Sequence, residues 1–181
     1  MTTVTPSSFS NFITIALLLS LCACNLRGTY IDAADPTSAK LRFVSYAENS
    51  TLDYYDAEHC EGKTTGLLNN WITTDSFRRV GMSTLAPLRA AYLEIKIPAE
   101  KDLFLLLNSL DIYGVSCAIT LPLRGEISEE YELTLNRSGS FCTVAVERLA
   151  DHSKQTFRAR EHSFVPRKFP PCTGKTAFFT E

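Results

Sequence analysis

Hydrophobic and polar residues alternate with a period of two over much of the chain from Lys40 onward, which is the pattern of half-buried β-strands. Residues 93–97 show it clearly, with Leu and Ile at every second position until Pro98 ends the run. A short polar link over 136–140 joins two such runs and predicts a hairpin. The segments expected as strands are 40–43, 52–55, 93–97, 103–107, 117–121, 131–136 and 141–148.

No part of the chain shows a sustained helical period, since the one candidate, residues 85–92, contains Pro87. About seven short strands with turn residues between them predict an all-β fold, an immunoglobulin-like or transthyretin-like β-sandwich. The link 123–130 is long enough to carry the chain from one sheet to the other.

Residues 12–23 are almost continuously apolar, and a run of this length is too short to span a bilayer core of about 30 Å. It fits the apolar region of a signal peptide, although residues 1–11 contain no Lys or Arg. The run ends in Leu21-Cys22-Ala23-Cys24, which resembles the lipobox of bacterial lipoproteins. The alternative is a buried N-terminal helix of a cytosolic protein.

The lipobox resemblance implies that Cys24 becomes the first residue of the mature protein and carries acyl chains that enter the lipid bilayer. Asn25 follows in place of Asp, and in enteric lipoproteins this implies transport to the outer membrane, facing the periplasm. We therefore expect a signal peptide over 1–23, a lipidated tether over 24–39 and the sandwich over 40–149. Residues 150–181 form a basic extension, in which a last edge strand is possible at Thr176–Thr180.

The chain has six cysteines, of which Cys22 would leave with the signal peptide and Cys24 would be lipidated. The other four are widely spaced without a Cys-x-x-Cys pair, a pattern that favours two disulfides in an oxidising compartment over zinc or redox chemistry. Three pairings are open. We favour a bridge across the core between two inward-facing positions, with the second bridge fixing the extension: Cys117 with Cys142, and Cys60 with Cys172.

Composition and charge narrow the function classes. Of 181 residues, 45% are hydrophobic and 21% charged, which indicates a globular domain. The net charge of −2 gives no electrostatic reason to expect nucleic acid as a partner. Charge is uneven, however: residues 53–61 hold four acids without a base, and residues 148–175 hold seven bases, so the two surfaces are expected to attract each other.

No catalytic residue, metal site or cofactor is expected. His59 and Cys60 are neighbours in the chain, and adjacent side chains on extended backbone point apart. The acidic run lacks the spacing of a calcium loop, and two further histidines lack metal-ligand spacing. Catalytic motifs with Gly-x-Ser-x-Gly, His-Glu-x-x-His or Ser-x-x-Lys are absent from the sequence. Aromatic residues could form either a binding patch or core: Tyr54, Tyr55, Trp71, Phe77 and Tyr92.

Several short patterns over residues 40–148 resemble a group of uncharacterised proteobacterial lipoproteins with a small β-sandwich domain: Asp56-x-x-x-Cys60, Val80-Gly81-Met82, Ile97-Pro98-Ala99-x-Lys101, and Cys117 followed by Tyr131 and Cys142. The resemblance supports fold and location but implies no activity. We expect a non-enzymatic module that binds an unknown envelope protein or serves envelope assembly. The alternatives are an inhibitor or immunity lipoprotein that blocks a hydrolase, and a weak hydrolase. A long exposed edge strand would favour the first function and a projecting polar loop the second.

Overall fold

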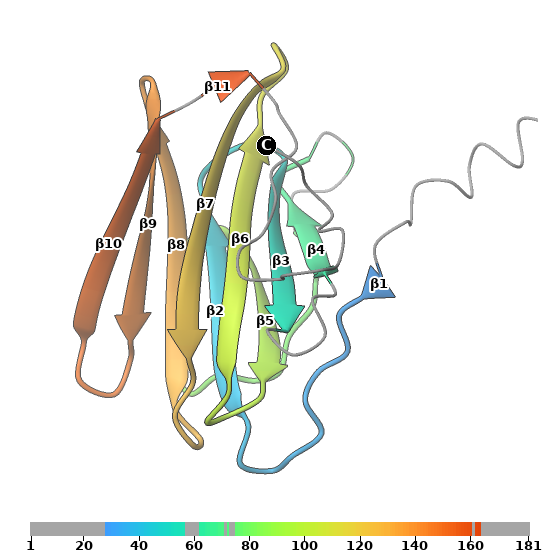
Figure 1. The fold of residues 1–181 in the computed structure, drawn as a ribbon, viewed down its shortest axis with the longest axis vertical. Coiled ribbons are helices and arrows are strands. Elements are labelled where there is room, and N and C mark those ends of the chain that lie inside the picture. The colour runs from blue at the N-terminus through green and yellow to red at the C-terminus, as the bar shows by residue number, and fades with distance from the viewer. Residues whose placement is uncertain (1–27, 57–61, 71, 73–74, 161, 164–181) are drawn as a thin grey trace, which may run out of the picture.

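Two β-sheets pack face to face around one hydrophobic core (Figure 1). The computed structural model describes residues 28–56, 62–70, 72, 75–160 and 162–163. The strands within these ranges are β1 Gly28–Thr29, β2 Ala39–Ser45, β3 Ser50–Asp56, β4 Gly62–Leu68, β5 Ala91–Ile97, β6 Asp102–Leu110, β7 Val115–Arg124, β8 Glu130–Ser138, β9 Phe141–Arg148, β10 Ser153–Arg160 and β11 His162–Ser163.

The six-stranded sheet has the order β1-β4-β3-β6-β7-β11, and the five-stranded sheet has the order β10-β9-β8-β2-β5. All pairings between the longer strands are antiparallel except that of β2 with β8, which is parallel. The prediction of an all-β sandwich is confirmed. The finer immunoglobulin-like or transthyretin-like assignment stays a prediction.

The core follows the period-two pattern of the sequence. In β2, Leu41 and Phe43 are fully buried between the sheets, and in β5 the same holds for Leu93, Ile95 and Ile97. Each large apolar side chain buried in this way contributes about 1.5–3 kcal/mol relative to an exposed one. Alternation therefore fixes which face of each strand turns inward.

All seven predicted strands are present, and the link 123–130 does carry the chain from β7 in one sheet to β8 in the other. The predicted hairpin is β8–β9. Residues 85–92 form no helix, and β5 begins at Ala91. Strands β1, β4, β10 and β11 were not predicted, and the edge strand expected at Thr176–Thr180 lies outside the described residues.

The chain is packed on the sandwich earlier than the predicted 24–39 tether suggests. Gly28 and Thr29 pair with β4, and Tyr30 is buried with its ring centroid 4.6 Å from that of Tyr54. The Tyr30 hydroxyl donates to the Lys96 carbonyl oxygen at 2.6 Å. Within the predicted tether, the part that the structure describes is therefore fixed to both sheets.

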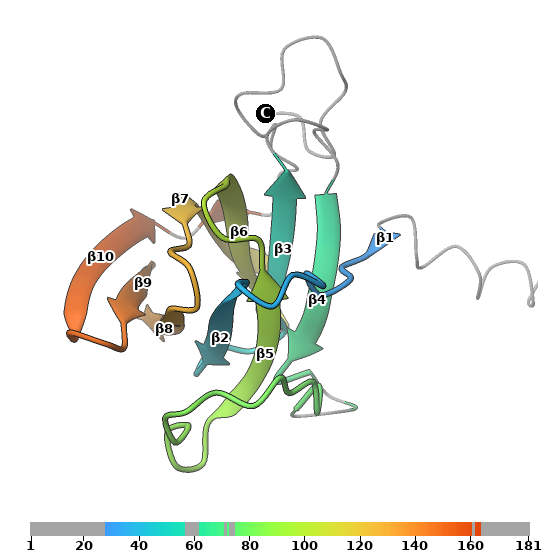
Figure 2. The ribbon, with the colours of Figure 1, turned by 90° about the horizontal axis from the view of Figure 1, so that it is seen from below.

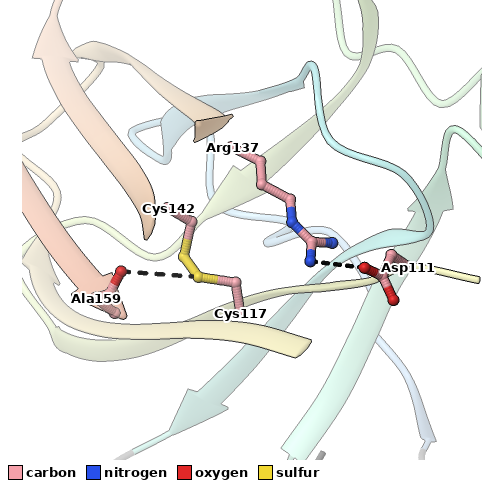
Figure 3. Close-up of a disulfide and its surroundings, with 5 residues drawn as sticks. All are labelled: Asp111, Cys117, Arg137, Cys142 and Ala159. Carbon is pink, nitrogen blue, oxygen red and sulfur yellow. Dashed lines mark hydrogen bonds and ion pairs between the residues drawn. A yellow bond between two sulfur atoms is a disulfide. The ribbon is translucent and has the colours of Figure 1, made fainter. Parts of the chain in front are cut away.

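The favoured Cys117–Cys142 disulfide is present (Figure 3). It joins β7 to β9 across the core, and both cysteines are fully buried. Cys24, Cys60 and Cys172 lie outside the described residues, so lipidation and the second bridge stay predictions. Among the described residues, no helix is long and apolar enough to cross a membrane.

Candidate functional site

A buried row of charges crosses the outer face of the five-stranded sheet. Cross-strand register places Glu132 of β8, Arg42 of β2 and Glu94 of β5 directly side by side. The Arg42 guanidinium lies 3.0 Å from Glu94 Oε1 and 3.2 Å from Glu132 Oε2. Only 2% of Arg42 is exposed, although it points away from the core between the sheets. Something on the outer face must therefore cover it.

Residues 80–85, within the connection between β4 and β5, lie over this charged row. Arg42 donates to the carbonyl oxygens of Thr84 at 2.5 Å and Leu85 at 3.3 Å. Glu94 Oε2 accepts from three consecutive backbone amides, those of Val80, Gly81 and Met82, at 3.1, 3.0 and 3.4 Å. Such runs of N–H groups bind an anionic oxygen well. Buried charges therefore hold residues 80–85 in one conformation.

A second charged pair holds the same connection. Lys40 Nζ lies 3.1 Å from Glu130 Oε1 and donates to the Gly81 carbonyl oxygen at 2.6 Å. Ser83 donates to Glu130 from both its amide and its hydroxyl. Burial acts to raise the pKa of Glu130, but the hydrogen bonds from Ser83 and Lys40 and the Lys40 charge outweigh it, so this pKa lies below its usual value.

The lowered pKa of Glu130 predicts a loss of stability in acid. A carboxyl whose pKa is lower in the folded state contributes stability above its unfolded pKa and loses it as pH falls through the folded value. We expect the free energy of unfolding to decrease as the pH is lowered below 4.5, the ordinary pKa of a glutamate. The decrease should be less steep in Glu130→Gln. Urea unfolding at several pH values measures both slopes. Glu48→Gln, at an exposed position, is the control, and equal slopes in the two variants would contradict the prediction.

Beyond the held segment, the connection presents an apolar tip. Leu85 and Leu88 are 97% and 93% exposed, on either side of Pro87. The Arg79 guanidinium lies 3.5 Å from the centroid of the Tyr92 ring and donates to the Tyr92 carbonyl oxygen at 2.8 Å. The base of the tip is thus fixed while its leucines face solvent.

The outer edge of β5 is closed by hydrogen bonds. The Glu94 amide donates to the Arg78 carbonyl oxygen at 2.9 Å, and the Lys96 amide donates to Asp32 Oδ1 at 2.8 Å. The Lys96 carbonyl oxygen accepts from the Ala33 amide at 3.1 Å. Together with the Arg79 contact to Tyr92, these bonds occupy backbone groups that a further strand would need.

The opposite edge of this sheet differs. β10 is its last strand. All eight of its residues pair with β9, and no other strand within the described ranges pairs with β10. Most of its residues are exposed, and it carries Lys154, Arg158 and Arg160. A long edge of this kind is a template for strand addition, and basic side chains on it disfavour pairing with another copy of itself.

The disulfide supports this open edge. The Cys117 sulfur lies 4.0 Å from the carbonyl oxygen of Ala159 in β10, as Figure 3 shows. Phe157 and Ala159 pack against the core from the same strand. Near the disulfide, Arg137 and Asp111 form an ion pair at 2.9 Å between β8 and the residue after β6 (Figure 3). β10 is thus supported from the core side, and no strand among the described residues pairs with its outer edge.

A groove of about 390 Å³ opens at the start of β10, lined by residues of β7 to β10 that include Leu123, Tyr131 and Val146. Arg148 lies within it but is surrounded by carboxylates, with Glu126 at 2.9 Å, Glu129 at 3.4 Å and Asp151 at 3.8 Å. Its positive charge is therefore already balanced, so the groove is not an anion site.

The residues named as candidates for chemistry do not form a site within the described structure. Asp53 is buried, whereas Glu58, His59 and Glu61 lie outside the described residues. His152 is exposed, with Nδ1 2.9 Å from Glu147. The described ranges contain no group of His, Cys, Asp and Glu that could hold a metal ion.

The aromatic residues proposed as a patch separate into different environments. Tyr54 and Tyr55 are buried, and Phe77 is 80% exposed. The Tyr92 ring lies under the Arg79 guanidinium. Trp71 lies outside the described residues. The comparisons with known proteins give no further guidance, because no family model and no curated protein matches the chain.

Neither the Glu132–Arg42–Glu94 row nor the β10 edge was predicted from the sequence. The row had a signal, since all three residues stand at outward positions of predicted strands. Strand order was the missing information, because the row exists only when β2 lies between β8 and β5.

Proposed function

We propose that this chain is a lipoprotein anchored through Cys24, facing the periplasm from the outer membrane, and that it binds an envelope protein without catalysing a reaction. The observation that supports binding is the open edge of β10, which is eight residues long and braced by the Cys117–Cys142 disulfide. The contrast with the closed edge of β5 supports it further, because described residues cover that edge of the sheet and none of them pairs with the outer edge of β10.

The chemistry of β10 indicates the kind of segment that would bind. An added strand would pair through backbone hydrogen bonds, while its side chains would meet Lys154 and Arg158. An extended segment with acidic residues at alternate positions fits this edge, because opposite charges at facing positions stabilise a strand pair by roughly 0.2–1 kcal/mol each. The sandwich would then act as a rigid receptor on the membrane.

Photo-crosslinking in the intact envelope tests the proposal. A benzophenone amino acid is placed at Lys154, Thr156 or Arg158, with the exposed Thr120 on the six-stranded sheet as the control. Strand addition predicts adducts with one partner at the β10 positions, and linked partner residues that advance in step along β10. No adducts at β10, or equal adduct formation at Thr120, would contradict it.

A second function, inhibition of a hydrolase, is favoured by the tip at Leu85 and Leu88. The expected inhibitory loop was polar, whereas this tip is apolar, but Arg42 fixes its base. A loop held in one conformation loses little entropy when it enters a cleft. The same photo-crosslinker at Leu85 distinguishes the two functions: adducts at Leu85 without adducts on β10 would favour inhibition.

A further inference from the structure

The position of Cys24 limits how the sandwich can stand on a membrane. Only residues 25–27 separate Cys24 from Gly28 in β1, which is paired with β4. Four residue steps span at most about 14 Å when fully extended. If Cys24 carries acyl chains, as the proposed function holds, the surface around β1 must therefore lie close to the bilayer.

That surface carries large apolar side chains in contact with solvent. Ile31, two residues after β1, is 81% exposed, and Phe77 is 80% exposed. The two lie on the same part of the surface, because Arg78 donates to the Tyr30 carbonyl oxygen at 3.1 Å and pairs with Asp32 at 2.9 Å. Ile72, in the same connection as Phe77, is 93% exposed.

The backbone at Phe77 is also unusual. Its φ angle of 56° lies in the left-handed region, which bulky residues rarely adopt. The Phe77 amide donates to Asp75 Oδ1 at 3.1 Å and so helps hold this conformation. An aromatic side chain fixed in strained backbone and pointing away from the core suggests a role outside the fold.

We propose that Ile31, Ile72 and Phe77 form a membrane-contact surface that inserts into the interfacial layer of the bilayer to which Cys24 is anchored. Apolar side chains enter such a layer by about 5–10 Å, and a second contact of this kind strengthens lipid anchoring. β1 and β10 lie at opposite ends of the molecule in both Figure 1 and Figure 2. Contact on the β1 side therefore directs the open β10 edge away from the membrane. This inference rests on the proposed lipid anchor.

Fluorescence quenching by brominated lipid tests this contact. The chain has a single tryptophan, Trp71, so Trp71→Phe gives a background in which one indole is introduced at a chosen position. The acylated full chain carrying Phe77→Trp is placed in phosphatidylcholine vesicles with or without brominated acyl chains. Thr156→Trp, at an exposed position of β10, is the matched control. Both substituted positions are exposed, so the two variants should unfold at the same temperature as the Trp71→Phe protein.

We expect brominated lipid to reduce emission at position 77 at least about two-fold and to leave emission at position 156 unchanged. Unchanged emission at position 77 in a protein whose mass shows acylated Cys24 would overturn the membrane contact and leave the anchor intact. Equal quenching at both positions would overturn the proposed orientation. A mass without acyl chains would overturn the anchor and this inference together.

Discussion

Replacing Arg42 with methionine is expected to lower the free energy of unfolding by about 3–5 kcal/mol. Among the residues that the structure describes, Arg42 is the cation that lies between Glu94 and Glu132, and only 2% of it is exposed. Without it, two carboxylates would face each other across β2 with little solvent to screen them. Urea unfolding of the wild type and Arg42→Met measures the difference.

A triple substitution separates the charge effect from loss of packing. Replacing the whole row by Arg42→Met, Glu94→Leu and Glu132→Leu removes the stranded charges, and buried ion pairs exchanged for apolar residues often lose little stability. We therefore expect the triple variant to be more stable than Arg42→Met alone. A triple variant as unstable as the single variant would show that the Arg42 effect does not come from uncompensated carboxylates.

Arg42→Met should also make the segment that covers the sheet more mobile. Arg42 donates to the carbonyl oxygens of Thr84 and Leu85, so its loss removes the bonds that hold the base of the tip. Amide hydrogen exchange over residues 80–86 should accelerate in Arg42→Met relative to exchange in β6. Equal protection in both proteins would mean that other contacts determine the conformation of this segment.

Removing the core disulfide by Cys117→Ala and Cys142→Ala is expected to cost about 3.5 kcal/mol. The bridge closes a separation of 25 residues, and the chain-entropy model gives this value for a loop of that length. Both sulfurs are also fully buried between the sheets, so their loss removes packing next to β10. Urea unfolding of the double variant measures the cost.

Reduction of the wild type is the control for this prediction, because it opens the bridge without deleting the sulfur atoms. Similar decreases in the free energy of unfolding in the reduced protein and in the double variant would show that the cross-link itself provides the stability. A loss under about 1 kcal/mol in both would contradict the view that this bridge stabilises the sandwich.

Much of the fold could be predicted from the alternation of residues, because burial of one strand face leaves a period of two in the sequence. β10 escaped prediction because it lies at the edge, where its polar residues SKQTFRAR need not alternate strongly with apolar ones. β4 escaped because its sequence, GKTTGLL, contains two glycines. At Gly66 an added Cβ would lie 3.1 Å from the Leu93 side chain, so a close approach of two strands explains that glycine.

The Cys117–Cys142 pairing could be predicted because both cysteines stand at inward positions of strands in opposite sheets. The covering of Arg42 could not. A polar residue at an outward strand position is expected to be solvent-exposed, and the sequence pattern does not reveal that residues 80–85 return across that face. Non-local contacts of this kind depend on strand order, which local sequence leaves open.

The proposed anchor and the open edge belong to one arrangement. Lipid on Cys24 would hold the β1 end at the bilayer, and the disulfide-braced β10 edge at the other end would meet a partner (Figure 1). The buried charged row would keep the long connection, and with it Phe77 and the leucine tip, in a defined place on the sandwich.

The mass of the intact protein extracted from membranes, before and after reduction, tests the central claim most directly. The account predicts a chain that begins at Cys24, carries acyl chains, and gains two hydrogens for each of two disulfides on reduction. A chain that retains Met1, lacks acyl chains and keeps its mass on reduction would contradict the lipid anchor and the export that it requires.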